Sequence, residues 1–311
     1  MTTALFTHDD GLAHETPPGH PERIDRLHAV RQALGAERFA PLLRDEMPRA
    51  TDADLLLCHP QAHLDALAAA ALETGLVPLD PDTWMSPGTL HAARRAVGGA
   101  CRAVDAVLAG TAANAFVAMR PPGHHAEPTR AMGFCYFGTA AIAARHALDR
   151  HGLARVAVLD FDVHHGNGTQ AILWDEPRSF YGSSHQMPLF PGTGAPDETG
   201  AHDTIVNAPL RAGAGTGAFR RAWDETILPR LDAFAPDLII VSAGFDAHRA
   251  DPLASLELGI DDFAWITSRI CDLADAHAGG RVVSTLEGGY DLSALAASVA
   301  AHVDVLMERG E

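Results

Sequence analysis

The sequence predicts an α/β fold built on a parallel sheet with crossover helices. Short apolar runs alternate with longer alanine-rich stretches along the chain, which is the pattern of strands joined by helices. Segments rich in Gly, Pro and Asp lie at or near the ends of the apolar runs. Although 311 residues suffice for two small domains, no repeat, low-complexity tract or linker divides the chain. We therefore expect one domain over residues 1–311.

The individual elements follow from hydrophobic pattern and from turn-forming residues. Five apolar runs are predicted as strands, at residues 4–7, 115–119, 156–159, 238–241 and 282–286. Seven stretches are predicted as helices, at residues 21–34, 60–73, 89–109, 139–151, 217–234, 261–277 and 292–309. Four long loops are expected, at residues 78–87, 120–132, 183–202 and 247–256. In open α/β sheets such loops gather at the carboxyl ends of the strands, where ligands bind.

The chain is acidic, with 23 basic residues, all of them arginine, against 40 Asp and Glu and a formal net charge of −17. Binding of nucleic acid as a primary function needs a basic face, so it is not expected. The acidity is compatible with a cationic substrate or partner, and it also serves solubility alone.

The cysteines argue for a reduced, cytoplasmic protein. The four are widely spaced and form no Cys-x-x-Cys pair, which speaks against a disulfide framework and a structural zinc knot. Polar residues 7–10 interrupt the first apolar run early, so no signal peptide is expected. No apolar run reaches the roughly 20 residues that span a membrane.

Residues 159–168, Leu-Asp-Phe-Asp-Val-His-His-Gly-Asn-Gly, are the most informative stretch of the chain. Side chains two apart share a face in extended backbone, so Asp160, Asp162 and His164 could project together. Carboxylates and an imidazole on one face suit a divalent transition metal, above all zinc. Taken alone, this pattern is also that of an ordinary polar strand end.

Three further apolar runs end in polar residues able to do chemistry. The first is followed by Arg-Pro-Pro-Gly-His-His at 120–125, a possible acid/base histidine pair on stiff backbone or two surface-loop histidines. The second ends at Asp246, which would complete an Asp-His-Asp ligand set or cap a turn. The third leads to Tyr290, either a hydrogen-bond donor or a tyrosine packed on a loop. The coincidence of four such strand ends favours a metal-dependent active site.

These motifs resemble those of the zinc-dependent histone deacetylase superfamily, in particular its bacterial class II-like members and the related acetylpolyamine amidohydrolases. The resemblance covers nearly the whole chain, and the motifs occur in the order of the family. They lie at residues 19–23, 120–126, 133–135, 162–168, 190–194, 244–246 and 287–290.

The resemblance implies a three-layer α/β/α fold of the arginase/deacetylase type, with a mainly parallel sheet and one catalytic zinc ion. It implies the following catalytic assignments. The zinc ligands would be Asp162, His164 and Asp246. His125, in contact with Asn167, would act first as general base and then as general acid. His124 would be its electrostatic neighbour, with Asp160 oriented toward it. Tyr290 would donate a hydrogen bond to the substrate carbonyl.

The resemblance also implies an acyl-lysine tunnel and a structural potassium site. Phe134 and Phe190 would form the aromatic walls, with the backbone carbonyl of Gly133 at the floor. Leu253 stands at the rim, and Asp82 lies where it could hold the substrate backbone. The potassium ligands would be Asp160, Asp162, His164 and Ser183, partly through backbone carbonyls.

The chain departs from the family pattern at a few positions. Glu287 and Asp291 flank the Gly-Gly-Tyr segment, unlike the glycine and asparagine of class I relatives. Gly138-Thr139 replaces a pair of asparagines, which we expect to affect packing rather than chemistry. His248 and Gly166 stand where a binuclear manganese relative would carry carboxylates, so a second catalytic metal is not expected.

The expected reaction is zinc-dependent removal of acyl groups, chiefly acetyl, from N-acyl-lysine side chains of a peptide or protein by metal-activated water. An acetylpolyamine amidohydrolase acting on small acetylated amines is the alternative, with acidity from Glu15 or Asp82 at the mouth. A non-catalytic acyl-binding protein and a ureohydrolase are both disfavoured, the former by the intact catalytic set and the latter by the missing carboxylates. The oligomeric state cannot be predicted from the sequence.

Overall fold

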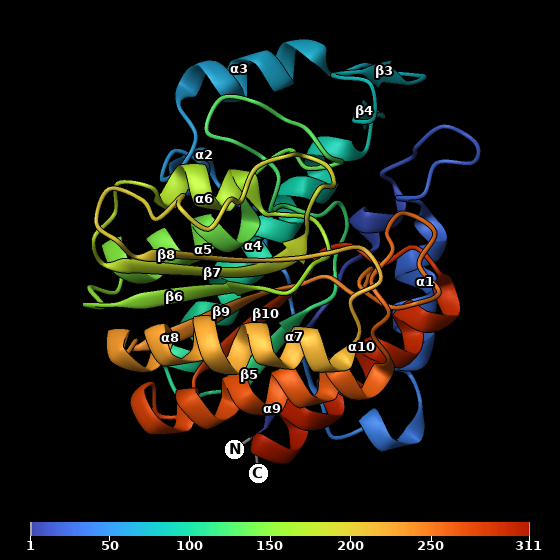
Figure 1. Ribbon diagram of the computed structural model, residues 1–311. Helices are drawn as coiled ribbons and strands as arrows, with labels where there is room; N and C mark the ends of the chain where they lie inside the picture. The colour runs from blue at the N-terminus through green and yellow to red at the C-terminus, as the bar shows by residue number, and fades with distance from the viewer. Residues whose placement is uncertain (1, 311) are drawn as a thin grey trace.

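The computed structural model, which describes residues 2–310, is centred on an eight-stranded sheet in which every pairing is parallel (Figure 1). The strands lie in the order β2-β1-β5-β10-β9-β6-β7-β8. In chain order they are β1 (Thr3–Phe6), β2 (Leu43–Asp45), β5 (Asn114–Val117), β6 (Val156–Asp160), β7 (Ser179–Gln186), β8 (Ile205–Leu210), β9 (Leu238–Ala243) and β10 (Val282–Leu286).

The central strands are short apolar runs because both faces of the sheet are covered. Along β6, Val156 and Val158 point into one hydrophobic core, while Ala157 and Leu159 point into the other. This alternation is the two-residue period of a strand. Two cores separated by one sheet give the three-layer arrangement that the motifs imply.

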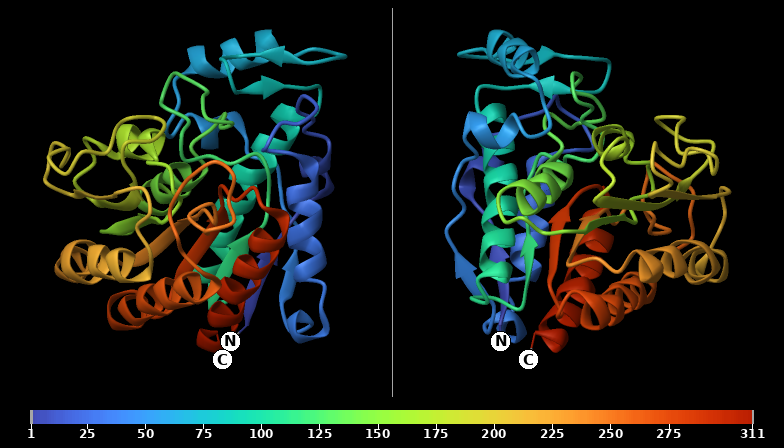
Figure 2. Two further views of the ribbon diagram at one scale, coloured as in Figure 1. Left: turned by 45° about the vertical axis from the view of Figure 1, so that its right-hand side comes forward. Right: turned by 90° about the vertical axis from the view of Figure 1, so that its left-hand side faces the viewer.

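Two groups of helices form the outer layers (Figures 1 and 2). One face carries α4 (Thr89–Leu108), α5 (Thr139–Asp149) and the short α6 (Asn167–Leu173). The other face carries α1 (Ile24–Ala33), α7 (Thr216–Ala222), α8 (Leu228–Phe234), α9 (Ile260–His277) and α10 (Leu292–Arg309). The prediction of a parallel α/β/α fold is confirmed.

The predicted helix at 217–234 is continuous but not uniform. A π-helical turn, η3 (Trp223–Ile227), joins α7 to α8. Pro229 stands in the first turn of α8, and because proline has no backbone N–H it cannot donate the next hydrogen bond of the ladder. Trp223 is fully buried there and donates its indole N–H to Ser184 Oγ at 2.9 Å. The wider turn therefore lies at a firmly packed position.

Three strands of the sheet, β7, β8 and β2, are not predicted by the hydrophobic pattern of the sequence. The prediction of a loop over 183–202 is wrong at its start, because Ser183 lies inside β7. Its residues are polar, but they are buried and paired: Ser183 Oγ lies 3.0 Å from Nδ1 of His185. β8 contains Pro209, which an edge strand tolerates. β2 is a short edge strand with exposed residues, so it shows no apolar run.

A smaller layer stands above α4 at the top of the view in Figure 1. It comprises α2 (Asp52–Leu55), α3 (Gln61–Ala70) and the hairpin of β3 (Val77–Pro78) and β4 (Trp84–Met85). Its own core includes Leu64, Leu67 and Tyr136. Two 3₁₀ turns, η1 (Asp9–Leu12) and η2 (Glu37–Phe39), complete the described elements. Within residues 2–310, no helix combines the length and hydrophobicity needed to cross a membrane.

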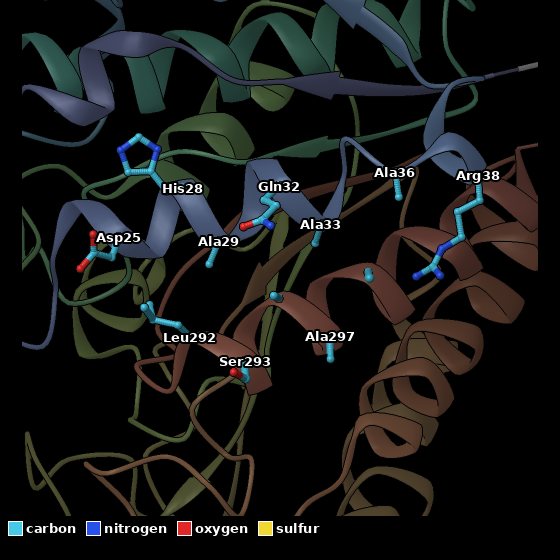
Figure 3. A pocket seen from close by; sticks show the side chains of 12 residues that line it. Asp25, His28, Ala29, Gln32, Ala33, Ala36, Arg38, Leu292, Ser293 and Ala297 are labelled. Carbon is cyan, nitrogen blue, oxygen red and sulfur yellow. The ribbon is translucent and has the colours of Figure 1, made fainter.

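A groove of about 760 Å³ runs between α1 and α10 (Figure 3). Half of the residues that line it are alanines, among them Ala29, Ala33 and Ala297. Small side chains let the two helices pack closely, and none of the side chains that line the groove belongs to the predicted site. The groove is therefore a feature of helix packing that is separate from the strand ends described next.

Candidate active site

The four strand ends singled out in the sequence belong to four adjacent central strands. β5, β10, β9 and β6 lie side by side, and all of them run in the same direction. The loops that leave these strands therefore emerge at one edge of the sheet. The chain visits the four strands in another order, and β7 and β8 intervene between β6 and β9, so the arrangement is a property of the topology.

Asp162, His164 and Asp246 form a compact cluster just beyond β6 and β9. Their ligand atoms all lie within 4.8 Å of one another, and all three residues are buried. His164 Nδ1 lies 3.2 Å from Oδ1 of Asp162 and 3.2 Å from Oδ2 of Asp246. Backbone N–H groups hold the carboxylates in place, since Val163 N donates to Asp246 at 2.8 Å and Gly288 N donates to Asp162 at 2.8 Å.

Two glycines let the backbone approach this cluster closely. A Cβ atom on Gly244 would lie 2.0 Å from Oδ2 of Asp162, and one on Gly288 would lie 2.1 Å from Oδ2 of Asp246. Both distances are far below van der Waals contact. Any side chain at either position would displace a carboxylate, which explains glycine in the two motifs.

The electrostatics of the cluster fit a bound cation. Burial, followed by the charge of Asp162, raises the pKa of Asp246 to about 7. Burial disfavours a charged imidazole, yet hydrogen bonds to Asp162 and Asp246 outweigh it and raise the pKa of His164 to about 10. The buried carboxylates of Asp162 and Asp246 repel each other unless positive charge lies between them, and a bound divalent ion would supply that charge. Two carboxylates and one imidazole suit zinc in a catalytic site, where three protein ligands leave a position open.

His124 is paired with a buried carboxylate. Its Nδ1 donates to Oδ2 of Asp160 at 3.0 Å, and Tyr181 donates to the same oxygen at 3.1 Å. Burial opposes the charged form, but the carboxylates of Asp162 and Asp160 outweigh burial and raise the pKa of His124 well above its usual range. Asp160 therefore holds a positive imidazolium beside the site.

His125 has the opposite environment. Its Nδ1 donates to Oδ1 of Asn167 at 2.8 Å, and the Nδ2 group of Asn167 donates to Oε1 of Glu127 at 2.8 Å. Burial, together with charge on His124 and His164, holds the pKa of His125 well below its usual range. The imidazole is neutral with its proton on Nδ1, so Nε2 is left with a lone pair, as a general base requires.

Tyr290 is held by its backbone and by a cation. Its N–H donates to Asp251 Oδ2 at 2.7 Å, and the Arg26 guanidinium lies 4.9 Å from the ring centroid. Burial raises the pKa of the phenol well above its usual range, although Arg26 opposes this. The hydroxyl therefore stays protonated and can donate a hydrogen bond.

A cavity of about 210 Å³ opens above these groups. The ring of Phe134 lies 6.0 Å from that of Tyr290, and the ring of Phe190 lies 5.1 Å from that of His125. The cavity is therefore apolar along its walls and polar where the walls converge. Its complete lining is Asp82, His125, Gly133, Phe134, His164, Leu189, Phe190, Leu253 and Tyr290.

All the predicted tunnel residues thus line one cavity, and Leu189 joins them. Glu15 does not line it and instead donates its backbone N–H to Ser86 Oγ at 2.9 Å. Of the predicted potassium ligands, Ser183 lies opposite Asp160 in the register of β7 and β6. Both residues are buried, and Asp162 N donates to Asp160 Oδ1 at 3.1 Å.

Three carboxylates without a predicted role surround the site, and two of them, Glu22 and Glu287, are buried. Glu287 accepts hydrogen bonds from Gly123 N at 2.7 Å and from Ser242 Oγ at 3.0 Å, and burial raises its pKa to about 7. Glu22 binds Arg120 through both carboxylate oxygens at 2.6 Å. Glu127 orients Asn167, as described above. Glu22 and Glu287 lie inside the motifs at 19–23 and 287–290, and Glu127 directly follows the motif at 120–126. Their position in or beside a motif was the available signal, although a charged residue is ordinarily solvated.

Comparisons with known proteins agree with this geometry. A family model for the histone deacetylase domain matches residues 20–306. The chain is 39% identical over 298 residues to a probable deacetylase of Archaeoglobus fulgidus, covering 94% of this chain and 82% of the relative. It is 43% identical over 281 residues to the histone deacetylase-like amidohydrolase of Pseudomonas aeruginosa, covering 88% and 73%. The crystal structure of the HDA15 HD domain matches with a TM-score of 0.93 and 35% identity, covering 99% of this chain and 88% of that chain. This chain therefore belongs to the histone deacetylase family and is a hydrolase of the deacetylase/amidohydrolase type.

Proposed function

We propose that this protein is a zinc-dependent amidohydrolase that removes acetyl groups from N-acetyl-lysine side chains of peptides or proteins. The observation that supports this most directly is the composition of the 210 Å³ cavity, in which aromatic walls lead to His125, His164 and Tyr290. An acetyl-lysine side chain has a matching order of chemistry, since an apolar alkyl chain precedes its amide.

Asp162, His164 and Asp246 would hold the zinc ion. When bound there, zinc would polarise the amide carbonyl and lower the pKa of water. A potassium ion with a structural role would lie beneath, with ligands from Asp160, Asp162, His164 and Ser183. This second assignment rests on the family resemblance and on the register of Ser183 with Asp160.

The protein's own groups would move the protons. His125 Nε2 takes a proton from the attacking water, while Asn167 keeps the other proton on Nδ1. His125 then returns the proton to the departing lysine amine, so one residue serves both half-reactions. His124, positively charged through Asp160, stabilises negative charge that develops nearby. The Tyr290 hydroxyl donates to the carbonyl oxygen as that oxygen becomes an anion.

The rim of the cavity bears on the substrate. Leu189 and Leu253 are apolar and offer nothing to a second cationic centre, which favours a peptide over a polyamine. Asp82 is the carboxylate among the lining residues, and it keeps hydrolysis of acetylated polyamines as the alternative function. Thr83 Oγ donates to Asp82 at 2.9 Å, so this carboxylate already has one partner.

We expect the zinc-loaded enzyme to prefer an acetyl-lysine peptide over acetylspermidine and acetylputrescine by at least about tenfold in kcat/KM, since 1.4 kcal/mol of transition-state binding corresponds to that factor. Steady-state deacetylation of the three substrates at equal ionic strength measures this. Preference for the polyamines would move the assignment to acetylpolyamine amidohydrolase. In that case Asp82→Asn would lower kcat/KM for the polyamines selectively.

Glu127→Gln is expected to lower kcat about tenfold with little change in KM. The carboxylate of Glu127 only accepts hydrogen bonds, so it forces the NH₂ group of Asn167 toward itself and Oδ1 toward His125. A glutamine can also donate, which lets the Asn167 amide turn over and lose the Nδ1-protonated form of His125. A hydrogen bond to a charged group contributes about 1.5–3 kcal/mol, and a tenfold loss of kcat corresponds to the lower end of that range.

The matched control is Asp175→Asn. A second cavity, separate from the acyl cavity, is lined by Asp175 together with Glu127 and Asn167. Asp175 contacts neither of them through an ion pair and instead lies with Oδ1 3.3 Å from Nε2 of His202. This variant should keep wild-type kcat. If Glu127→Gln were as active as Asp175→Asn, the orienting role of Glu127 would be wrong; a parallel rise in KM would point to altered substrate binding instead.

A further inference from the structure

A second cluster of metal-ligating side chains lies at the opposite edge of the sheet from the candidate active site. It consists of Asp105 near the end of α4, His146 near the end of α5, and His151 in the turn that follows. α4 ends shortly before β5 begins, and α5 ends shortly before β6 begins. The cluster is therefore at the amino ends of the strands, whereas the candidate active site is at their carboxyl ends.

The two histidines converge on one carboxylate oxygen. Nε2 of His146 and Nε2 of His151 each lie 2.7 Å from Oδ1 of Asp105. The three ligand atoms lie within 4.8 Å of one another, and the ring centroids of the histidines are 5.2 Å apart. Asp105, His146 and His151 are 41%, 13% and 32% exposed, so an ion could reach them from solvent.

His146 carries a second observation that bears on metal binding. Its Nδ1 is buried and has no hydrogen-bond partner. With the proton on Nε2, His146 donates to Asp105 and leaves an unpaired lone pair on Nδ1. With the proton on Nδ1, Nε2 becomes a free ligand and Nδ1 remains unpaired. Nδ1 therefore lacks a hydrogen-bond partner in both tautomers of His146. The tautomer that can bind metal through Nε2 leaves no further buried polar atom without a partner.

We propose that Asp105, His146 and His151 form a second metal site that binds a zinc ion and links α4 to α5. Two imidazole nitrogens and one carboxylate oxygen are a normal zinc donor set, with Zn–N of about 2.0–2.1 Å and Zn–O of about 2.0–2.2 Å. The histidine nitrogens already approach one oxygen at 2.7 Å, so small rotations of the exposed Asp105 and His151 side chains would admit the ion. Water completes the coordination.

The site would be structural rather than catalytic. None of its three residues lines the acyl cavity. Its ligands come from α4, from α5 and from the turn that follows α5, and both helices pack on the same face of the sheet. Zinc bound there would stabilise the folded state by mass action, because the three ligands converge only when α4 and α5 are packed together.

Titration of the tag-free, zinc-loaded protein with additional Zn²⁺ tests the proposal. Calorimetry should show one further equivalent, and thermal unfolding should move to higher temperature as zinc is added. His151→Ala should weaken this binding at least about tenfold, since loss of even an outer partner of a metal ligand costs 10–100-fold. Deacetylase activity of His151→Ala should equal that of wild type.

His277→Ala is the matched control. His277 pairs with Asp232 at 2.6 Å on the protein surface, and no second histidine joins that pair among the described residues. It should keep the additional zinc equivalent. The proposal is overturned if wild type binds no further zinc at 100 times the protein concentration in a low-micromolar titration, or if His151→Ala binds it as wild type does. Neither result depends on the proposed function, because no ligand of the candidate active site is changed.

Discussion

Tyr290→Phe is expected to lower kcat by roughly 10²–10³-fold, the loss typical for removal of one oxyanion-stabilising donor. The phenol stays protonated because burial raises its pKa, and it lines the cavity together with His125 and His164. Phenylalanine keeps the ring beside Arg26 and the backbone bond to Asp251, so only the hydroxyl is lost. Steady-state kinetics on an acetyl-lysine peptide measure the effect.

Zinc content and a second tyrosine variant separate catalysis from folding. Tyr290→Phe should retain stoichiometric zinc, because the hydroxyl is not among the proposed ligands. Tyr136→Phe removes a buried hydroxyl that donates to the carbonyl of Trp84, away from the cavity lining. Its kcat should stay within a few-fold of wild type. A fully active Tyr290→Phe enzyme would exclude the oxyanion role.

Asp246→Ala is expected to lose one equivalent of bound zinc relative to the wild type and, with it, measurable deacetylation. Asp246 is one of only two carboxylates in the ligand cluster, and removing it leaves His164 with Asp162 as its remaining carboxylate partner. Mutation of outer partners alone costs about 10–100-fold in metal affinity, so loss of a direct ligand should exceed that. Elemental analysis after dialysis against trace-free buffer gives the zinc content.

Asp246→Asn distinguishes loss of the ligand from loss of the fold. Asparagine can still accept the hydrogen bond from Val163 N, which the carboxylate accepts at 2.8 Å. This variant should unfold at a temperature close to that of the metal-free wild type, yet bind zinc weakly because its side chain is neutral. Retention of the full wild-type zinc content by both variants would remove Asp246 from the ligand set.

Buried strands made of apolar residues can be predicted from the sequence, whereas buried strands with polar side chains cannot. β9, Leu-Ile-Ile-Val-Ser-Ala, is buried on both faces and therefore reads as a continuous apolar run. β7 is just as buried, but its polar side chains are satisfied by partners such as Trp223, which is distant in sequence. No local pattern could predict that partner. Ser183 lies in the same strand and is polar as well as buried, so the local sequence predicts a loop there.

The buried charges around the site show the same limit. Glu22 and Arg120 are 98 residues apart and form a bidentate pair that is fully buried. Arg26 reaches across the fold to the carbonyl of Gly289 at 2.7 Å. A charged residue is ordinarily solvated, so the sequence alone assigns it to the surface. Only the folded chain supplies the opposite charges and carbonyls that make burial possible.

The sequence by itself determined the fold class, the family and the identity of the candidate catalytic residues, because hydrophobic period and motif composition are local properties. Tertiary structure alone decided that β5, β10, β9 and β6 are neighbours. It thereby brought His125, His164 and Tyr290 to one cavity and clustered Asp162 and Asp246 around His164. It also decided the protonation of the two adjacent histidines. The carboxylates of Asp162 and Asp160 hold His124 charged, whereas burial and the positive charge of His124 and His164 keep His125 neutral. Those fields arise from groups brought together through space, which a linear pattern does not encode.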